Sequence, residues 1–534
     1  MKKRVEKTLK EELGEDIKVE RSSGDHGDYA SNVAFLLAKR EKRSPVVIAR
    51  ELKEKVESEL FHKVEEKNGF LNFFLSEEVL QKELSGVLRD KEDYGKKREG
   101  KKVVIDYSSP NIAKAFGIGH LRSTIIGHAL YNIYAFQGWE VVGVNHLGDW
   151  GTQYGKLLYQ IKKEGENPEE LSIDDLEALY VRFHKEVEEN PEMEEEGRKW
   201  FAKLEKGDKE AREIWEICKK KSLEEFNKIY DDLEIKIDYV TGESFYENKL
   251  LDVIEEAKKK GVAKESKGAL IIEFDDMPPA MILKSDGSTT YLTRDLAAAK
   301  YRINEFSPDL FIYEIGVDQE LHLRQLFATV EKMGWAKKES FFHVAHGMYR
   351  LKEGKFSTRK GRTIHLKEVL ELAKKEAEKL SSEGSKEDAK RIGIGAVKYN
   401  DLKRHYKREV VFDWDEVISL KGDAGPYLQY TVVRCKSILG KAGNYNPSFE
   451  ELSEEERVIV KRITQFGEVV ELAAENFSPN VIAEYAHKLA KEYNAFYDKF
   501  TVLGDEKRIA ITEGTYIILK QCLSLLTISL PQKM

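Results

Sequence analysis

The chain has 534 residues, of which 41% are hydrophobic and 34% are charged, and its net charge is −8. This length exceeds what one hydrophobic core supports, so we expect two to four domains. No apolar run approaches membrane-spanning length, and the basic start leads into a charged helix, which excludes a membrane protein with a signal region. Three well-separated cysteines without CxxC pairs indicate a reducing cytoplasm and argue against a zinc site or disulfide framework.

The first part of the chain, 1–95, has the pattern of a small α+β module. A charged helix precedes a turn-rich loop at 24–30, and an amphipathic helix follows at 31–42. Pro45 suits the first turn of another helix, and 69–75 is a hydrophobic strand pattern. The highly charged stretch 90–102 is predicted to link this module to the next domain. By pattern alone, the module is a scaffold.

The stretch 103–138 predicts a buried strand, a polar turn with glycines and a long helix. Free backbone N–H groups and the helix dipole make such a turn an anion site. Lys114 and His120 add charge and hydrogen bonds at its mouth. The pattern alone leaves equal odds between a phosphate site and an ordinary strand–helix turn.

A second strand at 140–144 completes the βαβ unit of a doubly wound parallel sheet. Polar residues at 145–153 should then face the same crevice as the first turn. Asp149 among them fits the N-cap of the following helix, a role that is compatible with a functional one. Interspersed Glu and Lys from about 156 to 235 predict a solvated helical insertion.

The second half of the sheet is predicted to begin near residue 235. We expect strands at 237–240, 270–274, 309–315 and 342–348, and a hairpin turn before a helix that begins near Tyr291. A basic, glycine-flanked loop follows at 355–361. From residue 366 the pattern is helical to the end. There, 398–408 interleaves basic and aromatic residues, which fits either a nucleic-acid contact surface or a charged helix face.

Several of these stretches carry a family resemblance that covers essentially the whole chain. The run SSPNIAKAFGIGHLRSTIIG (108–127) resembles the first signature of class I aminoacyl-tRNA synthetases in its arginyl form. The segments YLTRDLA (291–297) and KFSTRKG (355–361) resemble the arginine-pocket segment and the second signature. GDYASNVAFLLAK and GFLNFFLS resemble the N-terminal domain of arginyl-tRNA synthetases, and GPYLQY resembles part of their helical anticodon-binding domain.

The resemblance implies a multidomain α/β protein with a Rossmann-type parallel-sheet catalytic domain. The expected domains are an N-terminal tRNA-contacting α+β module (1–95), the catalytic domain (96–368, with the helical insertion at about 156–235) and a C-terminal all-α helical bundle (369–534). It also implies ATP with Mg²⁺, L-arginine and tRNA(Arg) as partners, no protein-bound zinc and no membrane. We expect a cytoplasmic monomer that forms arginyl-adenylate and transfers arginine to the terminal ribose of the tRNA.

The same resemblance implies the site residues. Those expected at ATP are Gly117, Gly119, His120, Gly347, Met348 and Ser357. Those expected to act on the phosphates during catalysis are Lys114, His120, Lys355, Arg359 and Lys360. Those expected at arginine are Ser109, Asn111, Asp149, Glu243, Tyr291, Asp295 and Gln319. Those expected at tRNA are Lys403, Arg404, Tyr406, Lys407, Tyr427, Gln429, Tyr430, Arg434, Tyr493 and Met534.

Two positions depart from the family pattern. Gly117 stands where the first signature usually has a histidine, and Thr358 stands where the second usually has its second lysine. Members with a degenerate second signature carry a lysine just before the first, and Lys114 occupies that place, so we hypothesise that it restores part of the lost charge. The alternatives are a non-catalytic tRNA-binding relative with a decayed site, and an adenylating enzyme that does not use tRNA.

Overall fold

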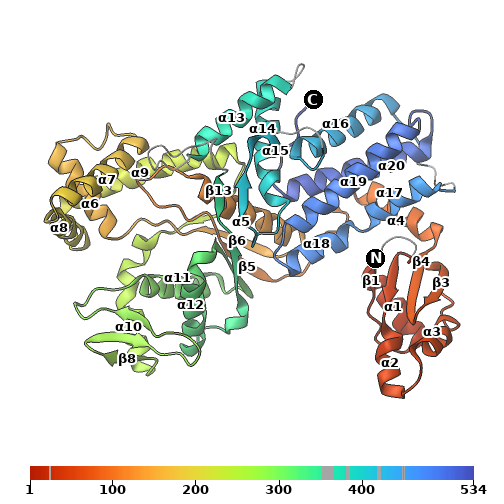
Figure 1. The fold of residues 1–534 in the computed structure, drawn as a ribbon, viewed down its shortest axis with the longest axis horizontal. Coiled ribbons are helices and arrows are strands. Elements are labelled where there is room, and N and C mark those ends of the chain that lie inside the picture. Colours follow the sequence, from red (N-terminus) through yellow and green to blue (C-terminus); the bar gives the residue numbers. More distant parts are fainter. Residues whose placement is uncertain (23–25, 352–364, 381–384, 418–421, 448, 450) are drawn as a thin grey trace. The chain divides into compact units, whose positions relative to one another are not determined.

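A computed structural model describes the chain except residues 23–25, 352–364, 381–384, 418–421, 448 and 450 (Figure 1). The chain divides into two compact units that are each built from separate stretches. The first unit comprises Met1–Lys96, Tyr427–Asn476 and Val481–Leu523. The second unit comprises Lys97–Pro426, Phe477–Asn480 and Ser524–Met534. Within the described residues, no helix has the length and apolar character needed to cross a membrane.

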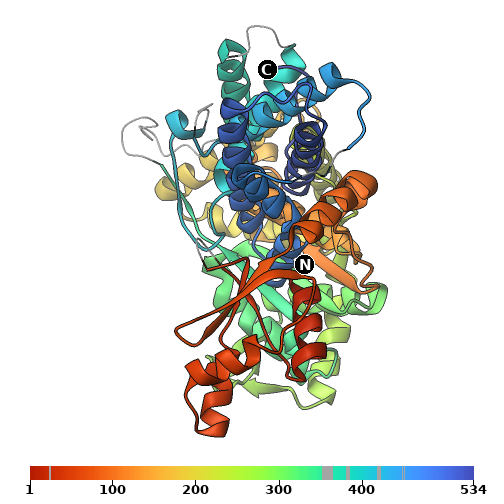
Figure 2. The same cartoon turned by 90° about the vertical axis from the view of Figure 1, so that its right-hand side faces the viewer.

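The first unit begins with an α+β module, shown in red in Figures 1 and 2. Its antiparallel sheet has the order β1-β2-β4-β3, with β1 (Glu20–Arg21), β2 (Tyr29–Ser31), β3 (Phe61–Lys67) and β4 (Phe70–Leu75). Its helices are α1 (Lys2–Leu13), α2 (Val33–Glu41) and α3 (Pro45–Lys53), and α4 (Glu77–Asp90) with the short η1 (Lys91–Asp93) leads out of it. The predicted helices and the strand at 69–75 are confirmed. The sequence analysis missed β3, whose charged residues hide the apolar alternation.

The remainder of the first unit is a helical bundle, drawn in blue in Figure 1. Its helices are α16 (Gly425–Ala442), α17 (Glu454–Thr464), α18 (Phe466–Glu475), α19 (Asn480–Lys499) and α20 (Glu506–Leu525). Ser453 and Glu456 form a reciprocal capping box that fixes the start of α17. The buried Tyr493 hydroxyl donates to Thr512 Oγ1 at 3.1 Å and so joins α19 to α20.

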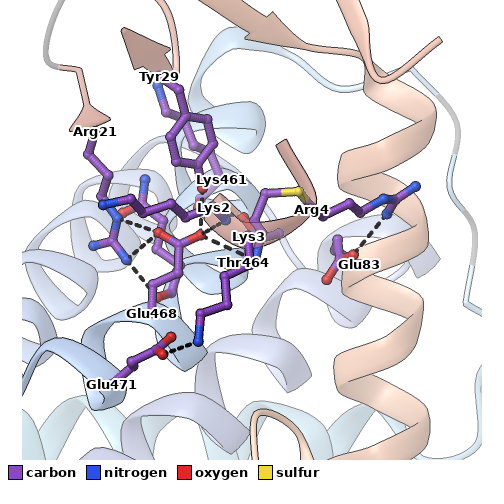
Figure 3. A network of polar contacts seen from close by, with 12 residues as sticks. Lys2, Lys3, Arg4, Arg21, Tyr29, Glu83, Lys461, Thr464, Glu468 and Glu471 are labelled. Carbon is purple, nitrogen blue, oxygen red and sulfur yellow. Dashed lines mark hydrogen bonds and ion pairs between the residues drawn. The ribbon is translucent and has the colours of Figure 1, made fainter. Parts of the chain in front are cut away.

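Glu468, on α18, accepts several of the polar contacts between the module and the bundle (Figure 3). Glu468 accepts hydrogen bonds from Arg21 Nε at 2.9 Å, from the Tyr29 hydroxyl at 2.6 Å and from the backbone N–H of Lys2. Arg21 also donates to the Gln465 carbonyl at 3.0 Å. Burial would raise the pKa of Glu468, but Arg21 and the other donors outweigh it and hold that pKa below its usual range. Glu468 is therefore ionised at neutral pH and fixes the module to α18.

The second unit is built on a five-stranded parallel sheet of order β12-β11-β5-β6-β7. Its strands are β5 (Lys102–Asp106), β6 (Glu140–Asn145), β7 (Tyr239–Val240), β11 (Leu310–Gly316) and β12 (Phe341–His346). Helices α5 (Ile118–Phe136), α11 (Tyr291–Phe306) and α12 (Glu320–Lys332) follow strands or turns at the carboxyl edge. Strand β6 lies on one side of β5, and the later strand β11 lies on its other side. This reversal of strand order creates a crevice at the carboxyl ends of β5 and β11.

A helical insertion, yellow in Figure 1, separates β6 from β7 as predicted. It contains α6 (Thr152–Glu164), α7 (Ile173–Glu189), α8 (Met193–Glu205) and α9 (Lys209–Asp232). The prediction that 270–274 belongs to the parallel sheet is wrong. That stretch forms β9 (Ala269–Ile272), the centre of a separate antiparallel sheet with β8 (Ala263–Ser266) and β10 (Ala280–Leu283). This small sheet, with η2 (Glu243–Lys249) and α10 (Leu250–Lys259), packs its apolar face against α11.

The prediction of helix alone after residue 366 is also corrected. Helices α13 (Leu366–Leu380), α14 (Lys386–Leu402) and the short α15 (Trp414–Val417) are present, but β14 (Val410–Phe412) pairs in parallel with β13 (Tyr349–Leu351). The last residues return to this unit. Buried Lys398 on α14 donates to the Thr527 carbonyl at 2.5 Å, and His128 on α5 lies 2.9 Å from Thr527 Oγ1.

Replacing Glu468 by glutamine should loosen the module from the bundle. The variant loses the charged acceptor of Arg21. We therefore expect its free energy of unfolding at pH 7 to be lower than that of wild type by about 1.5–3 kcal/mol. Because the folded-state pKa is depressed, the wild-type advantage is present above pH 4.5 and is lost as the pH falls through that depressed pKa. Urea unfolding at pH 7 and pH 3.5 measures both effects.

The matched control is Glu484→Gln on α19, whose carboxylate forms one exposed ion pair with Lys488. Such a surface pair is worth about 0–1 kcal/mol. Equal losses in the two variants would show that Glu468 has no special part in holding the module.

Candidate active site

The turn after β5 lies at the sheet reversal and is held in a constrained conformation. Ser108, Ser109 and Ala113 have positive φ values of 75°, 48° and 58°, a left-handed geometry that costs side-chain-bearing residues about 1–3 kcal/mol each. Surrounding groups enforce this turn. Ser109 Oγ donates to Asp106 Oδ1 at 2.9 Å, and its N–H donates to Asn145 Oδ1 at 3.1 Å. Backbone of this kind is concentrated at functional sites.

Asn111 continues this turn and pairs with the loop that follows β6. It forms an isolated parallel bridge with Gly148, and a Cβ at position 148 would lie 1.9 Å from Asn111 Oδ1. Glycine is therefore required at 148 for the observed approach. The turn after β5 and the loop after β6 form one wall of the crevice, as their shared sheet edge predicts.

Helix α5 begins at the same place, with Gly117 as its N-cap. A Cβ at Gly119 would meet no atom within 4 Å, so the first turn is open to a ligand. Burial lowers the pKa of the adjacent His120, the Gly117 backbone raises it less, and the charge of Lys114 lowers it further. His120 is therefore a neutral imidazole at pH 7. It is half-buried at the mouth of the site.

Lys114 lies with its Nζ 5.0 Å from the ring centre of Tyr180 on α7. Among the residues that the structure describes, Lys114 has no carboxylate partner. Its charge is therefore available to an anion, and the cation–π contact steadies it. The helical insertion thus reaches the site through Tyr180, a contact with no local signal in the sequence.

The strand β12 ends at a backbone that α5 holds in place. Buried Arg122 donates to the carbonyls of Gly347 and Arg408, both at 2.7 Å, and pairs with buried Asp401 at 3.2 Å. Met348 beside Gly347 is exposed. The sequence analysis missed Arg122 and Asp401. The available signal was an arginine on an otherwise apolar helix, whose partner lies far away in the chain.

Asp149 is buried. Its carboxylate accepts from the Ser244 N–H at 2.8 Å and the Ser244 hydroxyl at 2.6 Å, and pairs with Lys219 at 2.6 Å. Gly151 and not Asp149 caps α6, so the N-cap prediction is wrong. Asp149 holds the turn that carries the neighbouring Glu243.

Glu243 is a mostly buried acid whose nearest cation is Arg294, with Arg294 Nε 3.6 Å from Glu243 Oε2. Burial raises the pKa of Glu243 to about 8, with Arg294 lowering it less and Asp295 and Asp149 adding to the increase. Glu243 is consequently protonated at pH 7 until another cation approaches. A second cation beside it would be stabilised.

Tyr291 and Asp295 come from the first turns of α11, as predicted. Tyr291 is 60% exposed at the first helical position. Asp295 lies one turn further on and contacts His322 Nε2 at 2.6 Å and His146 Nε2 at 3.5 Å. Gln319, at the end of η3 (Val317–Gln319), is exposed and donates to Asp318 at 3.4 Å. The two histidines were not anticipated because nothing near them in sequence resembles a ligand pattern.

The predicted residues of the second signature, Lys355, Ser357, Arg359 and Lys360, lie outside the described residues. The chain just after them is anchored to the first signature. His365 bridges to Gly117, and the Leu366 N–H donates to the Phe116 carbonyl at 2.7 Å. The two signature stretches are therefore tied together at this point.

The residues predicted to contact tRNA divide into exposed and buried groups. Lys403 and Arg404 are half-buried and both pair with Glu416, at 2.9 and 2.7 Å. Lys407 and Tyr430 are exposed, while Tyr427, Arg434 and Met534 are half-buried. Arg434 lies 4.7 Å from the ring centre of Tyr430.

Three members of that set do not lie on the surface, contrary to the expectation of a contact surface. Tyr406 is 4% exposed, and Gln429 and Tyr493 are 0% exposed. Tyr399, in the same basic and aromatic stretch as Tyr406, is buried as well. The stretch therefore has one face in the core, and its aromatic residues supply that face. In this conformation these side chains pack and do not touch a partner.

A parallel sheet with an open helix N-terminus and basic groups at its reversal point defines a nucleotide-binding α/β protein. Comparison with known families specifies this class. Residues 83–414 match the family described as "tRNA synthetases class I (R), catalytic domain". Residues 1–75 match "Arginyl tRNA synthetase N terminal domain", and 428–534 match "DALR anticodon binding domain". The chain belongs to the arginyl-tRNA synthetase family.

Individual relatives match over nearly their full length. The arginine--tRNA ligase of Clostridium botulinum (strain Loch Maree / Type A3) is 43% identical over 532 residues, covering 96% of this chain and 94% of the relative. The solved arginyl-tRNA synthetase of Thermus thermophilus superposes with a TM-score of 0.86 at 26% identity, covering 100% of both chains. That of Plasmodium falciparum gives 0.85 at 25% identity, covering 100% of this chain and 99% of the other.

Replacing Gly347 by alanine should destabilise the protein. The added Cβ would lie 2.8 Å from the carbonyl carbon and oxygen of Arg408, backbone that Arg122 fixes. We expect the free energy of unfolding to fall by about 1–3 kcal/mol, which is typical of overpacking against atoms that cannot move aside. Urea unfolding measures it, with Gly440→Ala in α16 as the control, since a Cβ there meets nothing within 4 Å. An unchanged Gly347→Ala protein would show that the 408 backbone is not fixed.

Proposed function

We propose that this protein is an arginine–tRNA ligase. It uses ATP to convert L-arginine to arginyl-adenylate and then transfers arginine to the 3′-terminal ribose of tRNA(Arg), releasing AMP. The observation that carries this proposal is the placement of two acidic side chains, Asp295 and Glu243, at the same sheet edge as the open N-terminus of α5. Arginine has two cationic groups and a carboxylate that must reach a phosphate, and this arrangement offers a partner for each.

Asp295 accepts the guanidinium in a bidentate, charge-assisted pair, and the Tyr291 hydroxyl adds a further bond. Glu243 receives the α-amino group, whose charge would ionise this carboxyl. Asn111, Ser109 and Gln319 bind the amino-acid end. Asp149, also assigned to the arginine site, supports it by holding the turn that carries Glu243 through Ser244.

In the first step, the arginine carboxylate attacks the α-phosphorus of ATP. A carboxyl–phosphate bond forms as the bond to pyrophosphate breaks. The protein contributes positioning and electrostatic stabilisation of the charge on the phosphate oxygens. We assign His120 and Lys114 to the α-phosphate, and Gly117, Gly119, Gly347 and Met348 to the nucleotide.

The second signature completes this assignment. Lys355, Arg359 and Lys360 would act on the β- and γ-phosphates together with the Mg²⁺ that accompanies ATP, and Ser357 would contact the nucleotide. In the second step, a hydroxyl of the terminal ribose attacks the arginyl carbonyl and AMP leaves.

For tRNA, we assign the N-terminal module (1–95) and the C-terminal helices (369–534) as binding domains on either side, in sequence, of the catalytic domain (96–368). Lys403, Arg404, Lys407, Tyr427, Tyr430, Arg434 and Met534 remain candidate contacts. Tyr430 with Arg434 offers a planar stacking surface of the type that binds unpaired bases. We place the protein in the cytoplasm as a monomer.

The test is arginine-dependent ATP–pyrophosphate exchange, with and without tRNA(Arg), together with charging of the tRNA. We expect charging, and exchange that requires tRNA. Asp295→Asn should raise the arginine KM by roughly 30-fold or more, because an arginine cation loses its charged partner. Asp286→Asn, in the exposed turn before α11, is the control. A folded protein that binds tRNA but supports neither reaction would be a non-catalytic relative.

Lys114→Ala should slow arginine activation by about 10²–10³-fold, the cost of one lost transition-state donor. The physical reason is that Lys114 makes up part of the charge lost where Thr358 replaces the second lysine of the second signature, and supplies a donor in place of the histidine missing at Gly117. Lys199→Ala, an exposed lysine on α8, is the matched control. Single-turnover adenylate formation at saturating ATP separates this effect from weaker binding. Activation by Lys114→Ala at the wild-type rate would refute the compensation.

A further inference from the structure

The proposed guanidinium acceptor already has two imidazole neighbours in the structure described. His322 Nε2 lies 2.6 Å from Asp295 Oδ2, and His146 Nε2 lies 3.5 Å from Asp295 Oδ1. Both oxygens that a guanidinium would approach thus face an imidazole nitrogen. His322 and Asp295 each retain 27% of their side-chain exposure, so a ligand can reach this pair from solvent.

The pair is held by two helices and a buried charge. His322 is in the first turn of α12 and Asp295 in the second turn of α11, and these helices pack through a shared apolar core. Behind them, buried Arg302 pairs with Asp106 at 2.7 Å and faces His146 Nδ1 at 3.4 Å.

The charged and titratable surroundings favour a proton on His322. Burial would lower the pKa of His322, but the hydrogen bond and charge of Asp295 outweigh it and raise that pKa above its ordinary value. The elements packed against α12 carry further charged or titratable groups: Asp318 on η3, His343 and His346 on β12, Lys338 and Glu339 on the short η4 (Lys338–Ser340), and Tyr291, Arg294, Lys300, Tyr301, Arg302 and Glu305 on α11. Burial would likewise raise the pKa of Asp295, but His322, His146 and Arg302 hold it below its usual range.

We propose that His322 is a positioning residue that stands in for the guanidinium of arginine. Its imidazolium pairs with Asp295 in the empty pocket, and arginine binding expels its proton to solvent. The neutral ring still carries an N–H, which continues to donate to Asp295 Oδ2, so the carboxylate is oriented in both states while the remaining lone pairs of its two oxygens accept the bidentate guanidinium. This inference rests on the proposed arginine-binding function of the site.

The chemistry explains why such a device suits this pocket. An unpaired carboxylate at this depth would take up a proton or rotate away, and either change would remove the binding partner of a guanidinium. A neighbouring imidazole keeps the carboxylate ionised and can itself become neutral near pH 7, which no other side chain does at its ordinary pKa. Protons and arginine should therefore compete, and arginine should bind more weakly as the pH falls.

Glu243 also loses a proton when the α-amino group of arginine binds, so the two contributions must be separated. The variant His322→Gln retains an N–H donor for Asp295 but cannot be charged. Calorimetric titration of the full-length protein with L-arginine, in buffers of different ionisation enthalpy, counts the protons released. At pH 6 we expect wild type to release up to about one proton more than His322→Gln.

The affinities should show the same difference. Between pH 8 and pH 6, the arginine Kd of wild type should rise more than that of His322→Gln, by up to about tenfold per unit below the pKa of His322. Similar affinities for the two proteins are expected at pH 8. The control His343→Gln removes a histidine that contacts the Ile315 carbonyl and not Asp295, and should match wild type.

Equal proton release and parallel pH profiles in wild type and His322→Gln would overturn the proposal. So would a His322→Gln protein that binds arginine poorly at both pH values, because His322 would then be needed for more than its charge. If His322→Gln does not fold, histidine-labelled wild type answers the question by NMR. One imidazole should deprotonate at pH 6.5 on addition of arginine, and no such change would contradict the proposal. Wild type that binds no arginine and charges no tRNA would instead refute the proposed function.

Discussion

The ion pair between Asp106 and Arg302 is the interaction on which the candidate site depends. It joins the end of β5 to α11 at 2.7 Å, with 2–3% of either side chain exposed. Through Asp106 it fixes the Ser109 turn, and through Arg302 it faces the histidine beside Asp295. Removing one partner of such a pair leaves an uncompensated buried charge, which costs about 3–5 kcal/mol. The turn at Ser109 and the histidine beside Asp295 therefore both depend on this one ion pair for their position.

Sequence patterns predicted the elements whose burial is regular along the chain. The strands β5, β6, β11 and β12 and the helix α5 are apolar on the expected positions, and each was found where the pattern placed it. The errors have physical causes. The apolar run 269–272 reads as a buried strand in any sheet, and nothing in its composition tells a parallel sheet from an antiparallel one. The pair β13–β14 joins two very short segments far apart in sequence, too brief for a periodic signal.

For the site, the resemblance supplied the candidate ligand-binding residues, and the structure adds the residues that contact them. Arg122, Asp401, Arg302, His146, His322 and Tyr180 come from six different elements or turns, so no spacing rule could group them. In the mixed basic and aromatic stretch 398–408, by contrast, the sequence analysis placed a buried residue on the surface. A sequence gives composition but not which face of a helix is buried, and Tyr406, predicted as a surface contact, lies in the core.

The chain crosses between the two compact units repeatedly, and residues 524–534 belong with the catalytic sheet. Lys398 and His128 hold Thr527 there, so the unit that begins at residue 97 is completed by residues more than four hundred positions later. During translation, the last contacts of the catalytic unit can form only after the whole bundle has been synthesised, because residues 524–534 follow it in the chain. Its folding is coupled to that of the bundle by the order in which the chain is made.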